Sequence, residues 1–209
     1  SPMSRVCLVL MCVFVLVARG STATESRQIV TDSDEARLLN NNTLRIPVAG
    51  CITGSFARAG AILQSSNLLE KVQQAYAAQL PKGTKPEFEV KSAGAGRYYY
   101  VNKYDERCDI RELWRATDTN TWFRCAFYVS GERNFGPFES LIYMTVQRDA
   151  MATTDVLNYT TDVHVWPHGA IVRVILRYMP GVEIYFRKKT ADMKVIITNV
   201  FLNLVTAQS

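Results

Sequence analysis

The sequence contains few of the residues from which metal sites and nucleophilic active sites are built. Its 209 residues include two histidines and five cysteines, and no CxxC pair occurs. His164 and His168 have a spacing that would suit zinc on a helix, but Pro167 lies between them, where a predicted strand runs into a turn. No local motif places a cysteine beside a histidine that would activate it. We therefore expect no metal, no cofactor and no enzyme activity.

Charge is also sparse, since charged residues make up 21% of the chain and the formal net charge is +5. The dense lysine and arginine stripe of a nucleic-acid-binding protein is missing, so we expect no nucleic-acid partner. The glycine-rich stretch 92–96 lacks the GxxxxGK[ST] pattern of a phosphate loop, and we expect no small-molecule substrate. A hydrophobic fraction of 48% favours a globular domain with a core. The mild basic excess favours an acidic partner or a membrane surface.

One uninterrupted apolar run is present, at residues 6–18. As a helix it spans about 20 Å, and with its tolerated flanks about 28 Å, close to the roughly 30 Å core of a bilayer. It is either a cleaved signal peptide, because small residues follow it, or a retained membrane anchor. The residues expected inside the membrane in the second interpretation are Val6, Leu8, Leu10, Val13, Phe14 and Leu16.

The rest of the chain predicts an α+β domain. Residues 1–20 form the anchor or signal peptide, 21–50 a polar linker and 51–209 the domain. Apolar residues recur at three- and four-residue steps within 55–80, which predicts two helices that end at Pro81. Aromatic and β-branched segments separated by turn residues then predict strands. These are 88–91, 97–104, 122–129, 141–147, 158–165, 170–178, 182–188 and 193–200. We expect the two helices to pack on one face of a mostly antiparallel, multi-stranded sheet.

Two groups of side chains are candidate sites on this sheet. Cys108 and Cys125 fall where two strands meet, so they are either a disulfide in an oxidising compartment or free buried thiols. Basic residues near the C-terminus repeat at even spacing, which on strands would place them on one face. They are Arg173 and Arg177 on one segment and Arg187 and Lys189 on the next. This basic face is either a docking surface for an acidic partner or an ordinary solvated surface.

Four stretches, in this order, resemble the intermembrane-space domain of the Tim-twenty-one family, a subunit of the mitochondrial presequence translocase. The related cytochrome oxidase assembly factor one is similar in its helix-then-strand layout. The stretches are SFARA (55–59) with NLLEKV (67–72), RCAFYVSG (124–131), LIYMTV (141–146), and 156–165 with 170–174. They correspond to the family's opening helix pair, its central strand, the next strand and a closing hairpin. Residues from about 180 onward extend beyond this resemblance.

The resemblance implies one transmembrane helix followed by a linker and a domain that faces the intermembrane space. It implies a non-enzymatic adaptor or accessory subunit of the inner mitochondrial membrane, which docks on the presequence translocase or a respiratory-chain complex. Its partners would be that membrane protein complex and, through the N-terminal helix, the lipid bilayer. The alternative is a secreted or surface α+β binding protein with a cleaved signal peptide, glycosylated at the sequons of Asn41 and Asn158.

Overall fold

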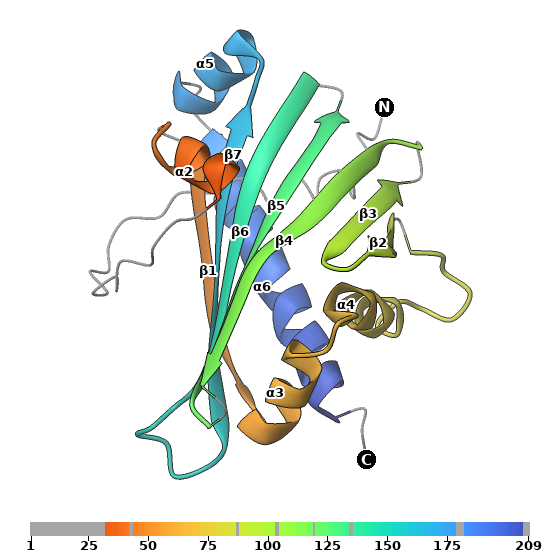
Figure 1. The fold of residues 1–209 in the computed structure, drawn as a ribbon, viewed down its shortest axis with the longest axis vertical. Coiled ribbons are helices and arrows are strands. Elements are labelled where there is room, and N and C mark those ends of the chain that lie inside the picture. The colour runs from red at the N-terminus through yellow and green to blue at the C-terminus, as the bar shows by residue number, and fades with distance from the viewer. Residues whose placement is uncertain are drawn as a thin grey trace.

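A seven-stranded antiparallel sheet dominates the computed structural model, which describes residues 32–41, 44–86, 88–102, 105–118, 120–133, 136–178 and 182–206. The strands are β1 (Leu44–Thr53), β2 (Phe88–Gly94), β3 (Arg97–Asn102), β4 (Arg107–Asp118), β5 (Trp122–Arg133), β6 (Gly136–Arg148) and β7 (Val156–Pro167). Their order in the sheet is β1-β7-β6-β5-β4-β3-β2, so five successive hairpins build the sheet and β1 pairs with the last strand. Figure 1 shows the sheet as one strongly twisted layer.

Helices cover the inner face of the sheet. They are α3 (Phe56–Leu63), α4 (Leu68–Ala77) and α6 (Val182–Thr206), and α6 runs behind the sheet in Figure 1. The last turns of α6 bury Phe201 and Val205, and the Phe201 ring stacks on Tyr159 of β7 with centroids 5.4 Å apart. Tyr159 Oη lies 2.6 Å from Thr198 Oγ1, which fixes the helix along its axis. A Cβ at Gly50 would lie 2.4 Å from Tyr159 Oη, so β1 needs glycine where this ring crosses it.

A short helix, α2 (Ser33–Leu39), crosses the outer face over β6 and β7. Asp32 begins it as the N-cap, since its carboxylate accepts hydrogen bonds from the backbone N–H groups of Asp34 and Glu35 at 2.9 and 3.2 Å. Glu35 is buried and accepts a hydrogen bond of 2.7 Å from the hydroxyl of Tyr143. Burial and this carboxylate raise the pKa of Tyr143, so its phenol stays protonated. The outer face is therefore covered through polar contacts.

The predicted fold class, an α+β domain with two helices on one face of a mostly antiparallel sheet, is wrong in its outline. The helices α3 and α4 and most of the central strands are nevertheless present where the sequence indicated them. The sheet has seven strands with helices on both faces, and the segment 105–120 contributes the strand β4. The predicted linker, 21–50, ends inside β1: residues 44–50 form the first part of this strand, in which the buried residues Ile46 and Val48 alternate with exposed ones. Pro47 is tolerated there because β1 is an edge strand.

The C-terminal strands are the largest error. Residues 170–178 and 182–206 form α5 (Ala170–Tyr178) and α6, so the closing hairpin of the family resemblance is absent. The segment is rich in β-branched residues, which favour strands. Its buried residues nevertheless follow a helical period, because Val200 and Leu204 are four apart, as are Phe201 and Val205.

The predicted anchor, 6–18, lies outside the described residues, as do residues 21–31, 42 and 43 of the predicted linker. Within the part of the chain that the structure describes, no helix is both long and apolar enough to cross a bilayer.

Candidate functional site

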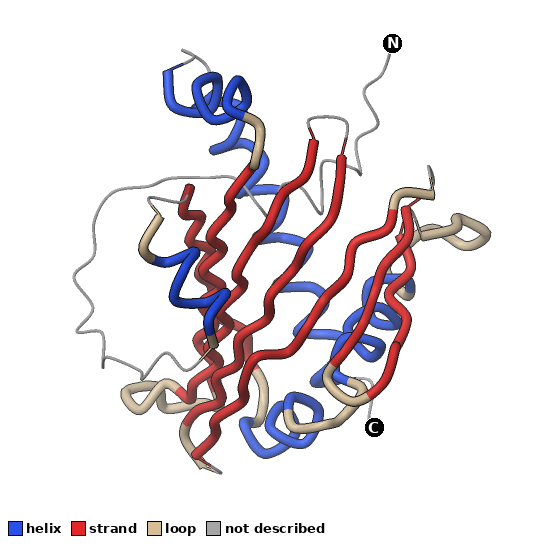
Figure 2. The backbone as a smooth tube through the Cα atoms, turned by 45° about the horizontal axis from the view of Figure 1, so that its top comes forward, coloured by secondary structure: helices blue, strands red, loops and turns tan. Residues whose placement is uncertain are grey.

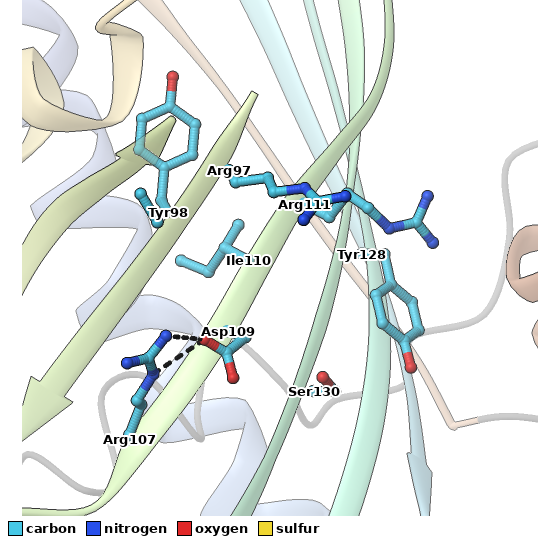
Figure 3. A pocket seen from close by; sticks show the side chains of 9 residues that line it. Arg97, Tyr98, Arg107, Asp109, Ile110, Arg111, Tyr128 and Ser130 are labelled. Carbon is cyan, nitrogen blue, oxygen red and sulfur yellow. Dashed lines mark hydrogen bonds and ion pairs between the residues drawn. The ribbon is translucent and has the colours of Figure 1, made fainter. Parts of the chain in front are cut away.

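A pocket of about 330 Å³ opens on the sheet where β3, β4 and β5 lie side by side. Its lining comprises Ala93, Arg97, Tyr98, Arg107, Asp109, Ile110, Arg111, Tyr128 and Ser130. Figure 3 shows the Arg97 side chain extending toward Arg111, whereas the Tyr98 ring points away from them. Tyr98 is buried and donates a hydrogen bond of 2.7 Å to the carbonyl of Ser66, before α4. The functional groups of this pocket are thus on the outer face.

Three arginines share the pocket because of how the strands pair. Arg97 lies directly opposite Arg111 in the β3–β4 register. Arg107 lies four residues before Arg111 on β4, and even spacing on a strand places side chains on one face. Like charges directly opposite each other in a sheet are unfavourable. The pocket therefore concentrates positive charge at a cost that a bound anion would relieve.

Arg111 is already neutralised within the chain. Its guanidinium pairs with Asp32 at 2.7 Å and with Asp34 at 2.9 Å, and it lies 5.2 Å from the centre of the Tyr128 ring. The hydrogen bond from Arg111 lowers the pKa of Asp32, and Asp32 raises the pKa of Arg111. The acidic start of α2 thus shows, inside this molecule, how carboxylates dock on this surface.

The other two arginines are less committed. Arg107 pairs with Asp109 at 2.7 Å and lies over the Tyr99 ring, but both partners of the pair are more than half exposed. Exposed pairs of this kind contribute about 0 to 1 kcal/mol, so an incoming carboxylate can compete for Arg107. Among the described residues, exposed Arg97 makes no ion pair. Arg97 and Arg107 are therefore the cations available to a ligand.

A polar cluster beside the pocket holds its wall and α2 in place. Glu139 of β6 accepts a hydrogen bond of 2.6 Å from the Tyr128 hydroxyl and lies 2.7 Å from His168 Nε2. It also accepts two from Arg37 of α2, the longer at 3.0 Å. Arg37, then Tyr128 and His168, hold the pKa of Glu139 at about 2. Burial and the Glu139 carboxylate raise the pKa of Tyr128, so its phenol donates a hydrogen bond and is no base near neutral pH.

The chemistry of this site is that of anion binding. The lining contains one carboxylate and neither histidine nor cysteine. No cluster of three histidine, cysteine, aspartate or glutamate side chains suited to a metal ion occurs within the described ranges. Guanidinium groups with a serine hydroxyl nearby match the geometry of carboxylates and phosphates.

The structure separates the residues of the predicted basic face. Arg173 and Arg177 lie on α5, and Arg187 and Lys189 lie on α6, so the shared strand face is wrong. Only the side chain of Arg173 is described: it donates a hydrogen bond of 3.2 Å to the His168 carbonyl and lies over the Trp166 ring. A partner-binding role for these four residues stays a prediction.

Of the two alternatives for Cys108 and Cys125, the structure contradicts the disulfide, and both side chains are buried. The two residues lie on neighbouring strands, but Cys108 is opposite Gly131 and Cys125 is opposite Arg115. Six residues of strand separate these positions, about 20 Å, whereas a disulfide needs Cα atoms within about 7 Å. Burial raises the pKa of the Cys125 thiol to about 12, which makes it unreactive.

The sequence interpretation missed the arginines of the pocket. The alternation Arg107-x-Asp109-x-Arg111 was a signal for a polar strand face. That Arg97 stands opposite Arg111 depends on the hairpin register, which no local pattern revealed.

No family model matches the chain, and no curated protein matches its sequence. Solved structures share only its general outline. A protein of Thermus thermophilus is 13% identical with a TM-score of 0.47, covering 79% of this chain and 99% of its own. A conserved protein of Geobacillus kaustophilus is 10% identical with a TM-score of 0.46, covering 78% and 97%. Norcoclaurine synthase of Thalictrum flavum, solved with dopamine and hydroxybenzaldehyde, is 12% identical with a TM-score of 0.43, covering 88% and 99%. Likenesses this distant indicate nothing about the activity of this chain.

Proposed function

We propose that this chain is a non-enzymatic docking domain that binds an acidic segment of a partner protein in the pocket lined by Arg97, Arg107 and Arg111. The observation that carries the proposal is the cross-strand pair of Arg97 and Arg111, of which only Arg111 is neutralised by α2. A partner carboxylate placed between Arg97 and Arg107 would pair with Arg97, which makes no ion pair among the described residues, and would compete with Asp109 for Arg107.

An acidic protein segment fits this pocket better than a buried small molecule. The arginines lie at an open surface of the sheet, where an extended chain can lay successive acidic side chains across β3 and β4. Ion pairs at such a surface form quickly, contribute little each and weaken with salt. The complex should therefore be transient and depend on ionic strength.

The identity of the partner stays a prediction from the family resemblance. That resemblance implies a membrane protein complex, either the presequence translocase or a respiratory-chain complex, with this domain in the intermembrane space. The alternative of a secreted protein, glycosylated at Asn41 and Asn158, also stays a prediction.

The test is fluorescence anisotropy of a labelled oligoglutamate peptide titrated with the full chain at low salt, with oligoglutamine as the control peptide. We expect binding of oligoglutamate alone, lost at roughly 1 M salt, where the Debye length is about 3 Å. Arg97→Glu should weaken it about tenfold or more, because it reverses the charge that meets the peptide.

Arg58→Glu is the matched control, because Arg58 is an exposed arginine on α3, which covers the inner face. It makes the same change in net charge and should alter the affinity less than about twofold. Equal weakening by both variants would mean that the peptide responds to net charge alone, and the pocket would not be the binding site.

A further inference from the structure

The helix α5 presents apolar side chains to solvent at one end of the molecule. Ile171 is 76% exposed and Val174 is 57% exposed, and their spacing of three places them on one side of the helix. α5 follows β7 and packs against that strand. Figures 1 and 2 show it standing beyond the ends of the strands, away from α3 and α4.

Positive charge accompanies this apolar pair. Arg173 lies between the two residues, is itself exposed, and is positioned by its contacts with the Trp166 ring and the His168 carbonyl. The sequence from α5 through the first half of α6, residues 170–194, carries six basic residues against two acids. These are Arg173, Arg177, Arg187, Lys188, Lys189 and Lys194 against Glu183 and Asp192.

A further apolar residue lies at the same end. Glu139 contacts both Arg37, near the end of α2, and His168, two residues before α5, which brings these two helix ends together. The last residue of α2, Leu39, is 39% exposed. The exposed apolar side chains therefore come from two segments that are far apart in the sequence.

We propose that this end of the molecule, made by α5 and the last turn of α2, docks on the surface of an anionic lipid bilayer. Ile171, Val174 and Leu39 would enter the interface between headgroups and acyl chains, while Arg173 contacts the headgroups. A short helix with apolar and basic residues side by side is the pattern of interfacial binding. A bilayer suits these residues better than a protein, because they project from a protruding helix and a fluid interface needs no matching groove.

The proposal is independent of the pocket, since no residue of the pocket lining belongs to α5 or α2. The experiment is hydrogen–deuterium exchange of the full chain, read by mass spectrometry with and without vesicles. Local exchange is read because the apolar run 6–18 would by itself carry the chain to any vesicle. We expect vesicles of phosphatidylcholine and phosphatidylserine to slow exchange severalfold in the peptide 170–178, and vesicles of phosphatidylcholine alone to leave it unchanged.

The double variant Ile171→Asp/Val174→Asp should lose this protection. Met151→Asp is the matched control, because Met151 is 92% exposed in the β6–β7 loop, at the opposite end of β7, and should keep it. Unchanged exchange in 170–178 while the chain binds vesicles would overturn the proposal. So would equal protection by both kinds of vesicle, or protection by an acidic protein instead of lipid, which would make α5 a protein-binding surface.

Discussion

The inner and outer faces of the sheet are covered by helices in two different ways. On the inner face, α3, α4 and α6 bury aromatic and aliphatic side chains such as Phe123 and Phe201. On the outer face, α2 is held by carboxylates and guanidinium groups, with Leu38 as its one buried apolar residue. Apolar burial is non-directional and scales with area, whereas each polar contact needs a defined partner. The inner face therefore sets the stability of the domain, and the outer face sets the position of particular charges.

This difference explains where the candidate site lies. A surface that already binds the carboxylates of Asp32 and Asp34 has arginines held in place by neighbouring strands. The proposed docking would add further carboxylates beside them and would need no rearrangement of the core. On the inner face, Arg115 is paired with Glu112 and donates to the carbonyls of Leu63 and Ser65, so this guanidinium is already bound within the chain.

The largest effect is expected from a truncation on the inner face. Phe201→Ala removes the ring that stacks on Tyr159 and leaves a cavity between α6 and β7, so the free energy of unfolding should fall by about 3 to 4 kcal/mol. Leu202→Ala, one residue along the same helix but 40% exposed, should change it by less than about 1 kcal/mol. Denaturation in urea measures both, and similar losses would contradict the assignment of Phe201 to the core.

An intermediate effect is expected on the outer face from Glu139→Gln. The neutral amide keeps the size of the side chain but loses the charge that binds Arg37, Tyr128 and His168. We expect a loss of about 2 kcal/mol at neutral pH, because a charge-assisted cluster is broken and Arg37, which is partly exposed, can still pair with Asp34.

The pH dependence isolates this carboxylate. The pKa of Glu139 is about 2 in the folded chain and 4.5 in the reference state, so its stabilisation is complete above pH 4.5 and is lost as the pH falls toward 2. The difference in unfolding free energy between wild type and Glu139→Gln should shrink over this range and vanish near pH 2. A difference that stays constant with pH would show that the amide disturbs packing and that charge is not the cause.

The sequence predicted the parts of the fold that local patterns determine. Apolar residues at helical spacing located α3 and α4, and alternation with turn residues located most of the hairpin strands. Pro47 and Gly50 made β1 look like a loop, because the pairing with β7 that accommodates them involves residues a hundred positions away. The β-branched residues of α6 suggested strand, because helix packing on the sheet overrides local propensity. The pocket depends on strand register and on α2 crossing the sheet, and neither is local.

The smallest predicted effect has the opposite sign to the others. Arg97 faces Arg111 across β3 and β4, and this like-charge pair is unfavourable in the free domain. Arg97→Gln should therefore raise the free energy of unfolding by about 0.3 kcal/mol at low salt, and the gain should disappear at high salt. Arg58→Gln, on the exposed side of α3, should change stability by less than this. Urea denaturation at two ionic strengths measures both variants.

If Arg97→Gln stabilises the fold but weakens binding of oligoglutamate, the role of Arg97 is in binding and not in stability. A loss of stability in Arg97→Gln would instead mean that Arg97 supports the sheet, and it would contradict the like-charge repulsion from which the docking site is argued.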